Sequence, residues 1–140
     1  MWTTEYTGTT AVSPERVWVT LRGLHTGELT YEGADAFELH GPFAAGTELT
    51  VTPVGQDAFE STIVELVENE TYADETQFGD LTLRFRHALV PIGDGGTRVT
   101  HRLEISGTDA DEVGPQLGPQ ISGDFDETMS KLFELALSRP

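Results

Sequence analysis

Two histidines late in the sequence, His87 and His101, have a spacing that brings them together. A glycine-rich turn at residues 93–96 separates them. Pairing Val90 with Arg98 across this turn places the two imidazoles opposite each other on one face of a hairpin. Imidazole titrates close to neutral pH, so it is the side chain best suited to hold a ligand oxygen or to move its proton. We therefore take this pair as the start of a candidate site.

The preceding turn adds a phenol and a carboxylate to the same face. A two-residue turn at Gly79-Asp80 sets Tyr72 opposite His87 and Asp74 on the diagonal. Two interpretations stay open, because buried polar groups need partners. Either these four side chains bond one another or water and complete the core, or they contact a carbonyl or hydroxyl of a ligand. They are also the candidates for catalysis, although no nucleophile lies beside them. A one-residue slip at the turn would point Asp74 and Tyr72 outward.

The two faces of these hairpins differ in chemistry, which supports the register. The outer face places Arg84 opposite both Glu104 and Glu75, so that charges of opposite sign meet in water. The inner face is apolar apart from the polar row. Its apolar members are Leu81, Leu83, Phe85, Leu89, Val99, Leu103 and Ile105.

The sequence predicts neither a metal nor a cofactor. The two histidines and Asp74 could in principle form an open zinc site, but zinc needs three or four well-placed ligands. No His-Glu-x-x-His, Gly-x-Gly-x-x-Gly, phosphate-loop or nucleophile-elbow pattern is present.

The elements that must carry these residues follow from periodicity and turn signals. Residues 1–10 have a strand-like composition, and Ser13 and Pro14 then begin a helix that we expect to end at Gly23. Residues 24–34 form a polar connection. From Ala36 to about Ser106 the hydrophobic period is two, with turn signals around residues 41, 55, 69, 79 and 94, which predicts an antiparallel meander.

The last part of the chain predicts a long amphipathic helix. From about Gln120 to Ser138, apolar residues recur at helical spacing opposite charged ones. Pro119 would remove a helical hydrogen bond, so we expect a kink or a delayed start there, and we expect this helix to gate entry to the interior. We expect the remaining histidines, His25 and His40, to be solvated.

Composition limits the classes of function. The 140 residues carry 24 acidic and 8 basic side chains, a formal charge of −16, and no cysteine. We expect a single domain over residues 1–140. A nucleic acid or an anionic membrane is a poor partner for this charge, and thiol chemistry is excluded. No run approaches the length of a membrane span. We expect a cytoplasmic protein that is a monomer or a homodimer.

Several segments resemble the START-like (SRPBCC) superfamily, in particular its small bacterial polyketide cyclase/dehydrase and lipid-transport group. Their order and spacing cover nearly the whole chain, although each is weak alone. One feature departs from the pattern, because residues 24–30 replace a tryptophan-rich stretch of many relatives. The matching segments are SPERVW at residues 13–18, GPFAAGT at 41–47, FRH at 85–87 and GGTRVTH at 95–101, followed by Gly107.

This resemblance implies an α+β helix-grip fold, in which a bent antiparallel sheet wraps around a long C-terminal helix. It also implies a small hydrophobic ligand, aromatic, polyketide-like or lipid-like, in a cavity between sheet and helix, with cyclase- or dehydratase-type activity as its enzymatic version. The alternative is an interaction module resembling chaperone activators, whose acidic surface docks a basic partner and whose interior is solid. We expect ligand contacts from Trp18, Tyr72, Asp74, Leu83, Phe85, His87, His101, Leu103, Ile121 and Phe125. Trp18 lies at helical spacing with Val17 and Leu21, which is typical of a core residue.

Overall fold

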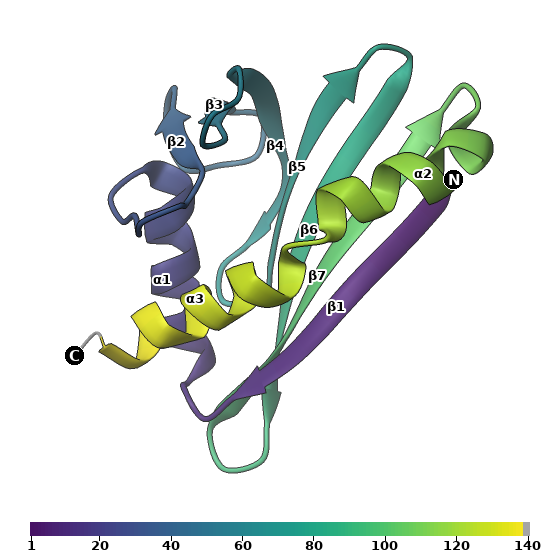
Figure 1. The fold of residues 1–140 in the computed structure, drawn as a ribbon. Helices are drawn as coiled ribbons and strands as arrows, with labels where there is room; N and C mark the ends of the chain where they lie inside the picture. The colour runs from purple at the N-terminus through teal and green to yellow at the C-terminus, as the bar shows by residue number, and fades with distance from the viewer. Residues whose placement is uncertain (139–140) are drawn as a thin grey trace.

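The computed structural model describes residues 1–138, and within them one seven-stranded antiparallel sheet curves around three helices (Figure 1). This is the predicted α+β layout. The order across the sheet is β1-β7-β6-β5-β4-β3-β2, so the first strand pairs with the last. The strands are β1 (Trp2–Thr10), β2 (Ala36–Leu39), β3 (Glu48–Thr52), β4 (Phe59–Val67), β5 (Thr71–Phe78), β6 (Leu81–Ile92) and β7 (Gly96–Gly107). The helices are α1 (Pro14–Thr26), α2 (Ala110–Ser122) and α3 (Phe125–Ser138).

The registers of the two long hairpins are those predicted. Tyr72 pairs with His87 between β5 and β6, and His87 pairs with His101 between β6 and β7. Gly79 has a φ of 63°, a left-handed conformation that glycine adopts without strain and that allows the tight turn between β5 and β6. A bulge between Ile63 and Glu65 in β4 adds to the bending of the sheet.

Helix α1 begins as predicted but continues one turn further. The backbone N–H of Arg16 donates to Ser13 Oγ at 3.4 Å, and Pro14 occupies the first helical position. The helix does not end at Gly23. It ends at Thr26, where Gly27 adopts the left-handed cap at φ 85°. Gly23 makes room for Leu29, because a Cβ at position 23 would lie 2.6 Å from a methyl group of that side chain.

The C-terminal segment contains a break but no delayed start. Helix α2 begins at Ala110, about ten residues before the predicted start, and the break falls between Ser122 and Phe125. Pro115 and Pro119 lie inside α2 on its exposed side, so the carbonyls that lose a helical partner face solvent. The two helices follow one another diagonally across the sheet (Figure 1).

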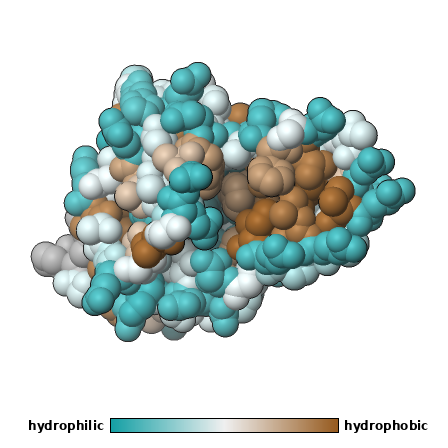
Figure 2. All heavy atoms as spheres, turned by 45° about the horizontal axis from the view of Figure 1, so that its top comes forward, coloured by the Kyte–Doolittle hydropathy of each residue, from teal (hydrophilic) through white to brown (hydrophobic). Residues whose placement is uncertain are grey.

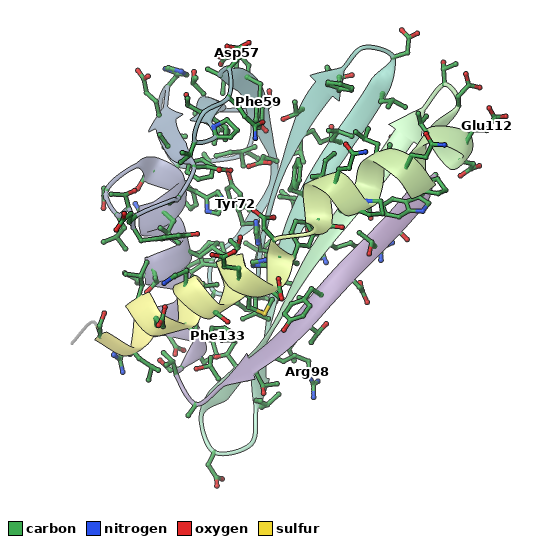
Figure 3. All side chains as sticks on the ribbon, in the orientation of Figure 1. Asp57, Phe59, Tyr72, Arg98, Glu112 and Phe133 are labelled. Carbon is green, nitrogen blue, oxygen red and sulfur yellow. The ribbon has the colours of Figure 1, made fainter. Side chains whose placement is uncertain are left out.

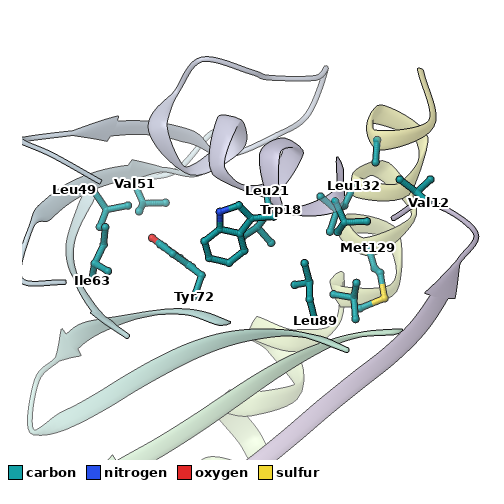
Figure 4. Packing of buried hydrophobic residues seen from close by; sticks show 13 residues of the cluster. Val12, Trp18, Leu21, Leu49, Val51, Ile63, Tyr72, Leu89, Met129 and Leu132 are labelled. Carbon is teal, nitrogen blue, oxygen red and sulfur yellow. The ribbon is translucent and has the colours of Figure 1, made fainter. Parts of the chain in front are cut away.

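The core consists of two apolar clusters that differ in how well they are covered. The closed cluster lies between α1, α3 and the sheet, and Figure 4 shows its side chains spread from Ile63 past Trp18 to Leu132. The open cluster lies beneath α2. The closed cluster comprises Val12, Val17, Trp18, Leu21, Leu49, Val51, Ile63, Tyr72, Leu89, Val99, Met129, Leu132 and Ala136. The open cluster comprises Leu81, Leu83, Leu103, Ile105 and Ala110, with Trp2, Phe85, Val113, Leu117, Ile121 and Phe125 only partly buried against it.

The outer face of the sheet carries ion pairs, with one difference from the prediction. Arg84 pairs with Glu75 at 3.5 Å, as predicted, but its second partner is Glu65 at 3.1 Å and not Glu104, which it faces across the strands. Glu104 binds Arg102 at 2.8 Å. A residue on a sheet has diagonal neighbours as well as a direct partner, and a long side chain reaches either.

Candidate functional site

A row of aromatic rings crosses the interior where the two clusters meet. The hairpins place Tyr72, His87 and His101 side by side on β5, β6 and β7. The ring centroids of His87 and His101 are 4.2 Å apart with an interplanar angle of 89°, so one imidazole meets the other edge-on. The His101 ring meets Phe125 at 6.0 Å, also edge-on. Phe125 therefore connects the row to the start of α3.

A third imidazole, His25, belongs to this row, and the prediction that it is solvated is wrong. The extra turn of α1 carries it inside, where the residue is 8% exposed. Its ring centroid lies 4.4 Å from Tyr72, 5.1 Å from His87 and 4.9 Å from Phe37. His40, by contrast, is exposed as expected.

The spacing of residues in the sequence indicates that His25 faces inward, but Gly23 within the same segment suggests an earlier helix end. Trp18, Leu21 and His25 are spaced three and four residues apart, which is the spacing of one helical face. Interpreting Gly23 as the helix end removes His25 from that face. Gly27, two residues after His25, is the glycine that caps the helix.

Hydrogen bonds fix the orientation of two groups in the row. The Tyr72 hydroxyl donates to Asp74 Oδ2 at 2.8 Å, so the phenol and the carboxylate act as a unit (Figure 3 shows Tyr72 between α1 and the sheet). His25 Nδ1 lies 2.8 Å from the carbonyl oxygen of Leu21. A carbonyl only accepts, so Nδ1 carries the hydrogen. In the neutral ring the lone pair is then on Nε2.

Two ring nitrogens of the row lack a partner. Among the described residues, His87 Nδ1 and His101 Nε2 are buried and make no hydrogen bond. His101 is 3% exposed, and His87 is half-buried as a residue with its Nδ1 buried. A buried polar group left unpaired costs about 1–3 kcal/mol. A group that enters this space and bonds these nitrogens would recover that free energy.

Burial keeps all three imidazoles from protonating in their usual range. It lowers the pKa of His101 to about 4 and, together with the neighbouring His101 and His25, holds the pKa of His87 well below its usual value. Burial also lowers the pKa of His25, but the charge on Asp74 acts in the opposite direction. The Asp74 carboxyl itself has a pKa raised by burial. The row is thus a set of neutral imidazoles beside one carboxyl group.

The other residues predicted to contact a ligand fall into two groups. Leu83, Phe85, Leu103, Ile121 and Phe125 come together in or against the open cluster, next to the histidine row. Trp18 lies in the closed cluster at 3% exposure and contacts Phe43 edge-on at 6.3 Å. Its position is that of a core residue, as its spacing indicated.

The open cluster has a solvent-facing hollow. Figure 2 shows an apolar, hollowed patch where α2 faces the ends of β5 and β6, with hydrophilic residues around its rim. Two further depressions, of about 270 and 250 Å³, lie between β1 and the start of α3. Tyr6 and Asp126 line both, and Phe125 lines the first. Phe125 therefore lies between that depression and His101.

The described part of the chain offers no ready metal centre. Within residues 1–138, no three histidine, aspartate or glutamate side chains are grouped so that they could hold a metal ion.

Over the same residues, none of the helices has both the length and the apolar character that crossing a bilayer requires.

Comparison with known proteins shows the fold. No family model matches the sequence, and no curated protein matches it. Solved structures do. Norcoclaurine synthase from Thalictrum flavum, solved with dopamine and hydroxybenzaldehyde, superposes with a TM-score of 0.77 at 16% identity, covering 99% of this chain and 88% of the other. The Zhui aromatase/cyclase from a Streptomyces species superposes with a TM-score of 0.76 at 12% identity, and the match covers 99% of this chain and 94% of the other.

A third similar structure, Ara h 8.0201, gives a TM-score of 0.70 at 22% identity and covers 99% of both chains. These proteins share with this chain the helix-grip fold, a bent antiparallel sheet packed against a long C-terminal helical segment. The fold predicted for this chain from its sequence resemblance is therefore confirmed, and it places the histidine row on the inner face of the sheet beside the C-terminal helices.

Proposed function

We propose that this protein binds a small hydrophobic ligand, aromatic, polyketide-like or lipid-like, between the sheet and the C-terminal helices. The single observation that carries the proposal is the pair of unpartnered nitrogens on His87 and His101, next to Phe125, which packs against the open cluster. A ligand that is mostly apolar with one or two polar atoms would cover the open cluster and bond the imidazoles.

The similar structures support this class of ligand. One was solved with dopamine and hydroxybenzaldehyde, and another is an aromatase/cyclase. In the enzymatic version of the proposal, the pocket holds a reactive chain in a productive conformation and excludes water. His87, His101, Asp74 and Tyr72 would orient carbonyl oxygens or exchange protons with them. The shape of the pocket would supply most of the rate enhancement.

Two substitutions with opposite expectations test the binding site. Ile121→Arg places a charge in the wall of the open cluster, whereas Val90→Arg places the same charge at a position that is 49% exposed. Native mass spectrometry of the purified protein should show a bound small molecule, identified after denaturation. The Ile121→Arg protein should lose it and the Val90→Arg protein should keep it.

Synthetic ligands extend the test to a protein that purifies empty. Naphthalene derivatives and medium-chain fatty alcohols should raise the melting temperature of the wild type and of Val90→Arg, but not of Ile121→Arg. If no natural molecule and neither class of synthetic ligand binds the wild type, the proposal is wrong. The acidic interaction module would then be favoured, and its binding to a basic partner should weaken as salt rises.

Substitution of His87 tests whether the protein catalyses a reaction or only binds its ligand. If the protein is an enzyme, His87→Ala should abolish product formation while it lowers ligand affinity only a few-fold, because most of the binding surface is apolar. If the protein only binds, no variant changes the chemical identity of the bound molecule.

A further inference from the structure

A further buried polar atom without a partner lies outside the histidine row, on Thr76 of β5. Among the described residues, Thr76 Oγ1 is buried and makes no hydrogen bond. The residue is 7% exposed, so it is nearly as deeply buried as His101. A buried hydroxyl group that has lost its water and found no partner favours any group that can bond it.

The register places Thr76 in the floor of the open cluster. Thr76 pairs with Leu83, and Leu83 pairs with Ile105, so the three side chains lie side by side on the inner face. Leu83 and Ile105 belong to the open cluster. The next inner-face pair, Phe78 and Leu81, lies where β5 ends and β6 begins, beside the apolar hollow in Figure 2. Thr76 is therefore one pair inward from that end of the sheet.

The distance between Thr76 and the histidine row follows from the strand geometry. On β6, four residues separate Leu83, the partner of Thr76, from His87. At about 3.3 Å per residue, this is about 13 Å along the strand. The inner-face pair between them on β6 and β7 is Phe85 and Leu103, and both belong to or pack against the open cluster. The floor is thus apolar over this length on β6 and β7, with unpartnered polar atoms at both ends.

The charges near this floor disfavour an acidic ligand. Asp74 lies between Tyr72 and Thr76 on the inner face of β5, and its carboxyl group is bonded to the Tyr72 hydroxyl. A carboxylate laid along the floor would approach this carboxyl group and would also be repelled by the chain's formal charge of −16. Neutral hydrogen-bonding groups therefore suit both ends better than a carboxylate.

We propose that the site takes an elongated, neutral ligand with a hydroxyl or carbonyl group at each end of an apolar body. One end bonds the Thr76 hydroxyl, and the other bonds the unpartnered nitrogens of His87 and His101. The apolar body lies over Phe85 and Leu103. This inference rests on the proposed function, because it specifies the ligand of that same site.

Two alcohols that differ at one end test the inference. Decan-1-ol and decane-1,10-diol have the same chain, but only the diol can bond both ends of the floor. In a purely apolar pocket the second hydroxyl would weaken binding, because it would lose its water without gaining a partner. We expect the wild type instead to bind the diol at least as tightly as decan-1-ol, as measured by isothermal titration calorimetry.

Substitutions at Thr76 assign the effect to its hydroxyl group. Thr76→Val replaces the hydroxyl by a methyl group of similar size, so it should weaken diol binding about tenfold and change decan-1-ol binding less than about twofold. Thr76→Ser keeps the hydroxyl and should retain the preference of the wild type. Thr100→Val, on the outer face of β7, is the control and should change neither affinity.

The empty protein gives a second measurement that needs no ligand. Thr76→Val removes a buried hydroxyl that has no partner, so it should raise the melting temperature. A lower melting temperature would mean that the hydroxyl already has a partner within the fold, which would overturn the inference.

The binding results distinguish this inference from the proposed function. If neither alcohol binds the wild type, and no natural molecule or naphthalene derivative binds it either, the proposed function itself fails. If both alcohols bind but Thr76→Val weakens them equally or not at all, Thr76 does not hold one end of the ligand. The inference is then overturned while ligand binding stands.

Discussion

The two helices of the C-terminal segment cover the sheet in different ways. Helix α3 buries Met129, Leu132 and Ala136 in the closed cluster. Helix α2 buries only Ala110, Gly114 and Gly118, and its larger apolar residues are partly exposed. Helix α3 thus seals the closed cluster, whereas the larger apolar side chains that α2 places over the open cluster stay partly exposed. The histidine row lies at the border between them.

Deleting a side chain in each cluster should give the largest contrast. Leu132→Ala removes a residue that is 2% exposed, and we expect a loss of about 2–5 kcal/mol in the free energy of unfolding. Leu117→Ala, in the partly exposed wall of the open cluster, should cost about 1 kcal/mol or less. Denaturant titrations measure both. Equal losses would contradict the distinction between the clusters.

The histidine row should make stability depend on acid. The pKa of His101 is lowered to about 4, so the unfolded chain binds a proton between its usual pKa of about 6.5 and pH 4 when the folded chain does not. The contribution of His101 to the free energy of unfolding is fully present above pH 6.5. It decreases by roughly 3 kcal/mol as the pH falls toward 4. His101→Phe should remove this loss.

The pKa of Asp74 is shifted in the opposite direction, which changes the curve of unfolding free energy against pH but not the difference between variants that all retain Asp74. Burial raises the pKa of Asp74, so its contribution falls as pH rises, with the opposite sign. The slopes of stability against pH are therefore compared between wild type, His101→Phe and the surface variant His40→Gln. A His101→Phe slope equal to that of the wild type would mean that this imidazole titrates in the folded chain as it does in the unfolded chain.

The contact between α2 and Trp2 should respond to a single methyl group. A Cβ at Gly118 would overlap the six-membered ring of Trp2. Gly118→Ala should therefore destabilise the protein by about 1–3 kcal/mol, although alanine favours the helix itself. In a Trp2→Leu background the same substitution should become neutral or stabilising. A double-mutant cycle in urea measures the coupling, and additive effects would show that Trp2 does not support α2.

The sequence predicts the hairpins well because their turns and their inner faces agree. Gly79 specifies one turn, the glycines at 93–96 specify the other, and alternate apolar residues select the same register. It predicts α2 poorly because Gly-Pro-Gln occurs twice within it, and such residues ordinarily end helices. Contact with Trp2 explains the glycines, and solvent on the outer side accommodates the prolines. Neither is visible in local sequence.

The candidate site is predicted in part for the same reason. The register brings Tyr72, His87 and His101 together, as the turn chemistry requires. His25 enters from a helix that is distant in sequence, and its place depends on which of two glycines ends that helix. Local patterns do not distinguish a glycine that caps from one that makes room for a neighbouring side chain, here Leu29.

The smallest effect that we expect is a difference in local unfolding, measured by amide hydrogen exchange, between α2 and α3. Amides of residues 114–123 should exchange faster than those of 126–137, because Pro115 and Pro119 each remove a helical hydrogen bond and α2 buries little apolar surface. A bound ligand should slow exchange in α2 more than in α3, since α2 supplies most of the cover of the open cluster and α3 supplies only Phe125. Uniform protection without ligand would mean that the segment opens as one unit. It could then not gate entry by loosening α2 alone.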